Sequence, residues 1–217
     1  MERRLPIRQN QDNPVYAGLL ESMDDAIGMV LDELEQLGLA DNTIVVFTSD
    51  NGGVASGDAF ATSNLPFRGG KGYQWEGGLR VPYLICVPWQ RSNGKQSDHP
   101  VTGADLYPTI LDYANIGLLK KQHADGVSLR PIIDRGKKLP ERPLYWHYPH
   151  YGNQGGDPSS VIRQGKWKLI HYYEDNHLEL FDLQQDPLEF HNVAGEVPRV
   201  ATALRKQLKQ WLTKVNA

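Results

Sequence analysis

The sequence contains little cysteine and no concentrated basic charge. Cys86 is the single cysteine among 217 residues, which excludes an internal disulfide and a cysteine-based zinc site. The 23 basic and 26 acidic side chains give a formal net charge of −3 without a long basic run, so the charge pattern of a nucleic-acid-binding protein is missing. No apolar stretch approaches the roughly 20 residues of a membrane-spanning helix. We therefore expect neither nucleic acid nor a membrane as a partner.

The N-terminal part of the chain has an order of elements that is typical of α/β proteins. Apolar residues recur at helical spacing from residue 14 to 37. Residues 43–48 are mostly β-branched and do not alternate with polar residues, which predicts a strand buried on both faces of a parallel sheet. A second strand is predicted at 81–87, where we expect Cys86 to be a small buried hydrophobic residue. A short helix is predicted at 105–113.

The C-terminal part has a different pattern. Residues 144–151 are aromatic and polar, and short strand-like segments follow, separated by turn residues. An apolar helical face recurs between 198 and 214. The predicted fold is therefore α/β, with residues 1–140 forming part of a mixed or parallel sheet sandwiched by helices. Residues 141–217 are predicted to form a small antiparallel sheet with a C-terminal helix.

Polar residues occur where ligands gather in an α/β fold. Asp50 and Asn51 directly follow the first predicted strand, and ligand sites in open α/β sheets lie beyond the carboxyl ends of strands. A carboxylate beside an amide carbonyl offers two adjacent hard oxygen ligands for a metal ion. Lys71 lies in a glycine-rich loop, where its ammonium can neutralise an anion that the backbone approaches closely. The plainer alternatives are a simple turn at residues 50–52 and a solvated loop lysine.

Several motifs, taken in order, carry a family resemblance. They lie at residues 48–52, 69–78, 105–109, 125–129 and 179–183. In this order and spacing they resemble the sulfatase family, in particular the arylsulfatase A-like enzymes of the alkaline phosphatase superfamily. The resemblance extends over nearly the whole chain. It implies the α/β fold of that superfamily and the hydrolysis of sulfate monoesters.

The resemblance also implies roles for individual residues. Asp50 and Asn51 are expected to bind a calcium ion, and Lys71 is expected to contact the sulfate group. Related phosphatases usually carry His at the position of Asn51, so the Asn favours a single calcium and a sulfate ester over a two-zinc phosphoryl site. His147 and His150 lie in the aromatic loop that we expect to shape the substrate cleft, with His150 touching the substrate. The expected substrate is a sulfated small molecule or glycan.

One part of the family pattern is missing from the sequence. Sulfatases carry a Cys or Ser within Cys/Ser-x-Pro-x-Arg, which matures to formylglycine and supplies the nucleophile, and no such motif occurs here. Residues 64–68 keep the Pro and Arg spacing, but Asn64 stands at the nucleophile position, and we interpret this match as coincidental. We therefore expect the chain to be the C-terminal half of a sulfatase, without catalytic residues of its own and inactive by itself.

Two alternatives to a simple fragment remain open. An inactive sulfatase-like binding module would keep the ligand site without the nucleophile. One half of a two-chain enzyme would have the missing N-terminal half as its partner, carried on a separate chain. Members of the family are often exported, whereas we recognise no signal peptide in this sequence.

Overall fold

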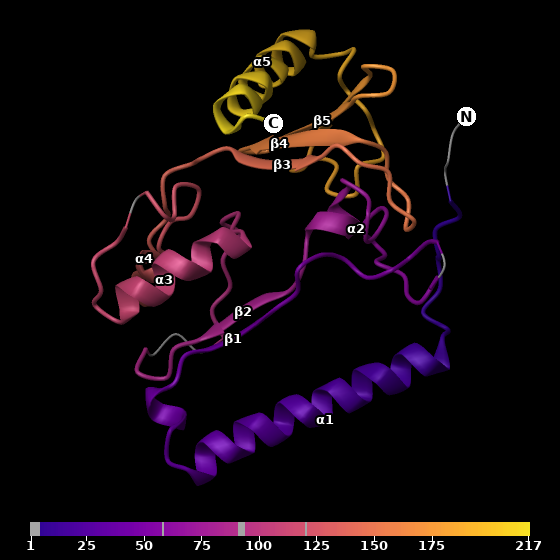
Figure 1. Ribbon diagram of the computed structural model, residues 1–217. Helices are drawn as coiled ribbons and strands as arrows, with labels where there is room; N and C mark the ends of the chain where they lie inside the picture. The colour runs from indigo at the N-terminus through magenta and orange to yellow at the C-terminus, as the bar shows by residue number, and fades with distance from the viewer. Residues whose placement is uncertain (1–4, 58, 91–93, 120) are drawn as a thin grey trace. The chain divides into compact units, whose positions relative to one another are not determined.

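The structure, a computed structural model, describes residues 5–57, 59–90, 94–119 and 121–217 (Figure 1). The chain divides into two compact units, each built from separate stretches of sequence. The first unit comprises the residues up to Met23, Asn51–Pro82 and Glu141–Ala217, and the second comprises Asp24–Asp50 and Tyr83–Pro140. The first unit therefore contains residues from both sides of the predicted boundary at residue 140. The assignment of residues 1–140 to an α/β part and of residues 141–217 to a small C-terminal subdomain stays a prediction.

Helices and strands occur in both parts of the described chain. The helical elements are α1 (Pro14–Gln36), η1 (Ala40–Asn42), α2 (Glu76–Leu79), η2 (Gly103–Asp105), α3 (Leu106–Tyr113), α4 (Arg130–Arg135) and α5 (Pro198–Val215). The strands are β1 (Val45–Thr48), β2 (Tyr83–Cys86), β3 (Leu144–Tyr148), β4 (Ser159–Gln164), β5 (Trp167–Tyr172) and β6 (Leu178–Asp182). This content of helices, strands and a C-terminal helix confirms the predicted fold class. None of the described helices combines the length and the apolar character that a membrane crossing requires.

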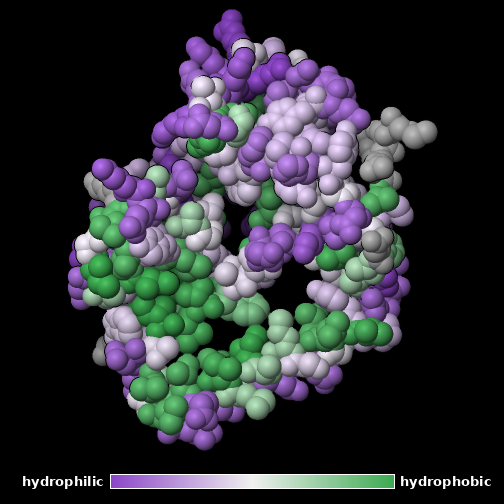
Figure 2. Space-filling view, viewed as in Figure 1, coloured by the Kyte–Doolittle hydropathy of each residue, from purple (hydrophilic) through white to green (hydrophobic). Residues whose placement is uncertain are grey.

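Helix α1 begins and ends where the sequence predicts. Asn13 caps its start, because Asn13 Oδ1 accepts the N–H groups of Val15 (3.1 Å) and Tyr16 (3.2 Å). Beyond its end, Gly38 has a φ of 66°, the left-handed conformation that commonly terminates a helix. None of the residues of α1 is buried, and Figure 2 shows hydrophobic side chains at the surface along the helix. The apolar face of the helix is therefore present but uncovered.

In the second unit, β1 and β2 pair antiparallel, with Val45 opposite Cys86. The expected parallel sheet with two-sided burial at residues 43–48 is therefore wrong at this point: Phe47 is 39% exposed. The expected burial of Cys86 is also wrong, because this residue is exposed. The reason is that β1 and β2 form a two-stranded ribbon in which alternate side chains share a face. Phe47, Leu84 and Cys86 all lie exposed on one face of that ribbon.

In the first unit, β3, β4, β5 and β6 form an antiparallel sheet in chain order. Strands β4 to β6 confirm the predicted antiparallel segments, whereas residues 144–148, expected to belong to a loop, form β3. Alternate side chains on a strand point to opposite faces, so the sheet supports two separate cores. On one face, Val161, Ile170, Tyr172 and Phe181 pack with Tyr73 and Trp75. On the other, Ile162, Leu169 and Leu180 pack with Ala201, Leu204 and Leu208 of α5. Figure 1 shows α5 and α2 on opposite faces of this sheet, so the glycine-rich loop before α2 is held on the face away from α5.

Candidate functional site

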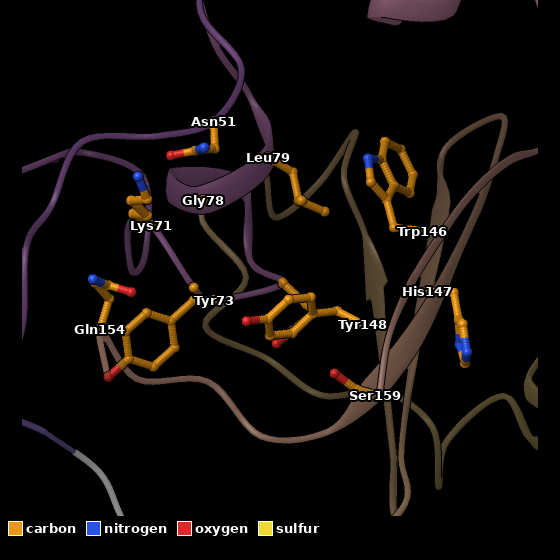
Figure 3. A pocket seen from close by; sticks show the side chains of 12 residues that line it. Asn51, Lys71, Tyr73, Gly78, Leu79, Trp146, His147, Tyr148, Gln154 and Ser159 are labelled. Carbon is orange, nitrogen blue, oxygen red and sulfur yellow. The ribbon is translucent and has the colours of Figure 1, made fainter. Parts of the chain in front are cut away.

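A pocket of about 320 Å³ lies within the first unit (Figure 3). It contains Asn51 and Lys71, two of the residues that the sequence predicts for the site. The rest of its wall comes from the glycine-rich loop, from β3 and from the segment that leads into β4. The lining residues are Asn51, Lys71, Gly72, Tyr73, Gln74, Gly78, Leu79, Trp146, His147, Tyr148, Gln154 and Ser159.

Two loops form the polar end of the pocket, one around Asn51 and one around Lys71, and a backbone hydrogen bond joins them. The N–H of Lys71 donates to the carbonyl oxygen of Gly53 at 3.0 Å, two residues after Asn51. Figure 3 shows the Asn51 amide and the Lys71 ammonium at the same end of the pocket. Tertiary structure thus brings together two predicted residues that are separated along the sequence. Among the described lining residues, Lys71 is the only lysine or arginine, so the positive charge of the pocket is concentrated at this end.

Asn64 fixes the relative position of these two loops, and sequence reasoning missed it. Its Oδ1 accepts the N–H of Gly53 at 2.8 Å, while its Nδ2 donates to the carbonyl oxygens of Gly53 (2.9 Å) and Gly69 (3.1 Å). A side-chain amide has a donor and an acceptor and can therefore bridge two backbone segments. The sequence signal for this role is an Asn between two glycine-rich segments. The Pro and Arg that follow Asn64 resemble the Cys/Ser-x-Pro-x-Arg spacing instead.

A second contact brings the segment before β4 against the lysine loop. A Cβ atom on Gly156 would lie 1.9 Å from the carbonyl oxygen of Gly72, so only glycine allows this approach. Both residues also have positive φ, 76° for Gly156 and 90° for Gly72. This backbone contact places Gln154, two residues earlier, in the wall of the pocket.

The remaining wall is largely aromatic. Trp146 and Tyr148 are two positions apart on β3, so they share one face of the strand, and both line the pocket (Figure 3). Trp146 also packs against the first core, whereas Tyr148 is 43% exposed. Tyr73, across the pocket, is buried and stacks on Trp75 with ring centroids 5.1 Å apart. Rigid aromatic side chains with polar tips can cover an organic group while accepting or donating hydrogen bonds.

The expectation that both histidines lie in a loop is wrong for His147, which belongs to strand β3, whereas His150 follows the end of that strand. His147 contributes to the pocket lining, but its ring is held by Ser160 and Tyr173: Nδ1 lies 2.7 Å from Ser160 Oγ and 3.3 Å from the Tyr173 hydroxyl. Its ring points away from the pocket interior in Figure 3. His150 is exposed, does not line this pocket and makes an edge-to-face contact with Tyr148 at 5.6 Å between ring centroids. Substrate contact by His150 stays a prediction.

Asp50 and Asn51 are neighbours in the chain, but they contribute differently to the site. Asp50 is exposed and is the last residue of one stretch of the second unit, whereas Asn51 lines the pocket of the first. Within the described residues, no three His, Cys, Asp or Glu side chains group closely enough to hold a metal ion. The oxygen donors of Asp50 and Asn51 match calcium in kind, but they are two of the roughly 6 to 8 ligands that calcium takes. Calcium binding stays a prediction.

Two family models match the chain and together cover almost all of it. Residues 3–116 match the model described as "Sulfatase". Residues 70–217 match the model described as "N-sulphoglucosamine sulphohydrolase, C-terminal". Both models overlap at the loop that carries Lys71, so the candidate site lies inside the region that both recognise.

Individual relatives agree with the family models. A protein named "Sulfatase" from Formosa agariphila is 33% identical, and the match covers 93% of this chain and 40% of the relative. The crystal structure of Ps i-CgsB in complex with k-i-k-neocarrahexaose is 30% identical with a TM-score of 0.77, covering 94% of this chain and 44% of that one. The structure of BT4656 in complex with its substrate, D-glucosamine-2-N,6-O-disulfate, is 29% identical with a TM-score of 0.70, covering 90% and 38%. The chain thus spans less than half the length of these relatives, and it belongs to the sulfatase family.

Proposed function

We propose that this chain is the part of a sulfuric ester hydrolase that binds the sulfate group and one side of the substrate. The observation that carries the proposal is the convergence of Lys71 and Asn51 at one end of a pocket whose other walls are aromatic. In this assignment Lys71 binds the sulfate. Asp50 and Asn51 supply part of a calcium site.

The chemistry of the polar end suits an ionised sulfate ester. A lysine ammonium is a compact charge with three donors, and it can pair with a sulfate oxygen without being deprotonated. The glycines beside Lys71 leave the backbone accessible to the anion. When calcium is bound, it supplies positive charge that offsets the negative charge on the sulfate.

The shape of the pocket favours a sulfated sugar as the substrate, with a sulfated aryl compound as the alternative. Its volume of about 320 Å³ lies at the small end of the range of roughly 300 to 1,000 Å³ for small-molecule sites. Trp146 and Tyr148 offer aromatic surface, and Gln154 and Ser159 offer hydrogen bonds, which is the combination that a hydroxyl-rich ring requires. The relative whose substrate is a glucosamine disulfate supports the same class.

We also propose that the chain lacks the nucleophile segment and does not turn over sulfate esters alone. The sequence contains no Cys/Ser-x-Pro-x-Arg motif, and the chain spans about 40% of the length of the Formosa relative. The uncovered apolar side chains of α1 support an additional protein segment in the intact enzyme. A binding module without catalysis is the second candidate, and it would keep sulfate binding without any complementing half.

A binding experiment on the 217-residue chain tests the core of the proposal. Inorganic sulfate is titrated while the amide NMR signals of Lys71 and Gly72 are followed, first without and then with calcium. The expected result is saturable shifts that Lys71→Ala weakens at least tenfold and that Lys206→Ala, at an exposed position on α5, leaves unchanged. Equal sulfate affinity in the Lys71→Ala variant and the parent chain would remove Lys71 from the site.

A turnover assay separates the fragment from an active enzyme. The purified chain is incubated with an aryl sulfate and calcium, and we expect no release of sulfate. Turnover clearly above that of Lys71→Ala would show that the chain carries a nucleophile and would contradict the fragment proposal.

A further inference from the structure

A buried cluster of charges lies between the sheet of the first unit and helix α2. Lys168 on β5 is 1% exposed, and its Nζ lies 2.9 Å from Glu76 Oε1 and 2.8 Å from Glu189 Oε1. The side chains of Glu76 and Glu189 are 5% and 0% exposed. The other carboxylate oxygen of Glu189 accepts the backbone N–H of Glu76. The proposed sulfate-binding function uses none of these groups.

The cluster is connected to the sulfate end of the pocket through very few bonds. Glu76 is the first residue of α2, and Gly77 and Gly78 follow it. The carbonyl oxygen of Gly78 accepts the N–H of Gly52 at 2.9 Å, and Gly52 directly follows Asn51. A backbone hydrogen bond therefore connects the helix that begins at Glu76 to the loop of Asn51.

The lysine loop rests on the same short helix. A Cβ atom on Gly78 would lie 2.6 Å from the carbonyl oxygen of Gly70, the residue before Lys71. The N–H of Gly77 donates to the carbonyl oxygen of Arg68 at 2.8 Å, which joins the start of this loop to α2. Both loops of the polar end are therefore placed by the position of α2.

Helix α2 needs an external support to hold that position. It has four residues, two of them glycine, and an isolated helix of this length is not stable in water. The cluster supplies the support, since Glu76 is held through its side chain by Lys168 and through its backbone by Glu189. Within the described residues, Glu189 Oε1 has no hydrogen-bond partner beyond its ion pair with Lys168.

Stability alone does not explain why the support is charged. Buried ion pairs are often no more stabilising than apolar side chains of similar volume, because the desolvation of the charges offsets their attraction. This cluster is unbalanced as well, with one lysine between two glutamates, and burial raises the pKa of Glu189 while the Lys168 ammonium opposes the shift. Such a cluster instead fixes the orientation of the backbone, because hydrogen bonds depend on direction and apolar contacts do not.

We propose that Lys168, Glu76 and Glu189 are positioning residues, which orient α2 and thereby set the geometry of Asn51 and Lys71 for sulfate binding. The proposal rests on the proposed function for its consequence in binding. The claim that these three residues hold α2 in place depends only on the contacts of the cluster, and it can be measured without any ligand.

The test compares Glu76→Leu with Glu76→Gln in the full chain. Leucine removes the contact between α2 and Lys168 and leaves one buried lysine with one buried glutamate, so the remaining charges balance. Glutamine keeps an acceptor oxygen for Lys168. Native-state hydrogen exchange is measured by NMR at Gly52 and Lys71, with the sheet residues Ile162 and Leu169 as internal controls, and inorganic sulfate is then titrated.

The expected result separates positioning from general stability. In Glu76→Leu, the amides of Gly52 and Lys71 exchange at least tenfold faster, those of Ile162 and Leu169 stay at parental rates, and sulfate affinity falls at least fivefold. In Glu76→Gln, all these values stay within about twofold of the parent. Glu76→Met is the second variant, and it is expected to show the same local pattern as Glu76→Leu, because it also leaves one buried lysine with one buried glutamate.

Two outcomes would overturn the inference. In one, Gly52 and Lys71 exchange at parental rates in Glu76→Leu and Glu76→Met. In the other, all four amides accelerate together in both variants, which would make the cluster a support for the whole unit. Absence of sulfate binding in the parent chain would instead count against the proposed function, while the exchange pattern would still decide on the positioning role.

Discussion

Gly52 and Gly77 pack backbone against backbone, closer than any side chain would permit. A Cβ atom on Gly52 would lie 1.8 Å from the carbonyl oxygen of Gly77. The adjacent Gly78 carbonyl accepts the Gly52 N–H at 2.9 Å. This contact joins the loop after Asn51 directly to α2.

Replacing Gly52 by alanine should break that junction. Because a carbonyl oxygen of the backbone cannot move aside like a side chain, we expect the free energy of unfolding to fall by about 3 kcal/mol, and sulfate binding to be lost. Urea denaturation and the sulfate titration measure the two effects. Gly18→Ala is the matched control: its Cβ meets nothing within 4 Å in α1, so it should stabilise by roughly 0.5 to 1 kcal/mol. Equal stability of Gly52→Ala and the parent would contradict the packing described here.

Asn64→Ala should loosen the two site loops without disturbing the sheet. The substitution removes three hydrogen bonds to the backbone of Gly53 and Gly69, and groups left without a partner cost about 1 to 3 kcal/mol each when buried. We expect sulfate affinity to fall at least tenfold, as measured by NMR titration. Gln9→Ala, which removes one exposed hydrogen bond to Ile7, should leave the affinity unchanged. If both variants bind sulfate like the parent, Asn64 does not position the site.

Glu189 should make stability fall as pH rises. Burial raises the pKa of its carboxyl above the ordinary value, so the native state holds the proton at pH values where the unfolded chain has released it. The contribution of Glu189 to the free energy of unfolding is therefore fully present below the ordinary glutamate pKa of about 4.3 and is lost as pH rises from there through the folded pKa. Glu189→Gln should flatten this slope. The measurement is urea unfolding as a function of pH, with the exposed Glu174→Gln as control; parallel curves for Glu189→Gln and the parent would refute the prediction.

Leu208 should be the main apolar anchor of α5. It is fully buried in the core between α5 and the sheet, so Leu208→Ala should lower the free energy of unfolding by about 2 to 5 kcal/mol. Gln210→Ala, two residues further along the same helix and exposed, should change it by no more than about 0.5 kcal/mol. Urea unfolding compares the two. A similar small effect for both would mean that α5 is not held by this core.

The sequence was sufficient for the features that depend on neighbouring residues. The ends of α1 follow from Asn13 and Gly38, because capping and left-handed termination act within one turn. The hairpins of β4, β5 and β6 follow from short strand-forming segments separated by turn residues, since hairpins are local structures. Strand β3 was not predicted from residues 144–148. The family resemblance likewise came from motifs in linear order, and both family models agree with it.

Strand environment was not determined by the sequence. An apolar run such as 43–48 has the same composition whether it is covered on both faces or lies in a ribbon, and the exposure of Phe47 and Cys86 follows from what packs on them. The roles of Asn64 and Lys168 were equally hidden. Asn64 bonds to Gly53, 11 residues earlier, and to Gly69, 5 residues later, while Lys168 pairs with Glu76, 92 residues away. An isolated Asn or Lys gives no local signal for such contacts.

The sequence by itself therefore determined the family and the fold class. Tertiary structure alone decided that Asn51 and Lys71 share one pocket, that Asn64 joins their loops, and that Lys168 is buried between Glu76 and Glu189. The physical reason is the range of the interactions. Propensity, capping and turns act between near neighbours, whereas close backbone packing and buried charge pairing exist only after distant segments have met.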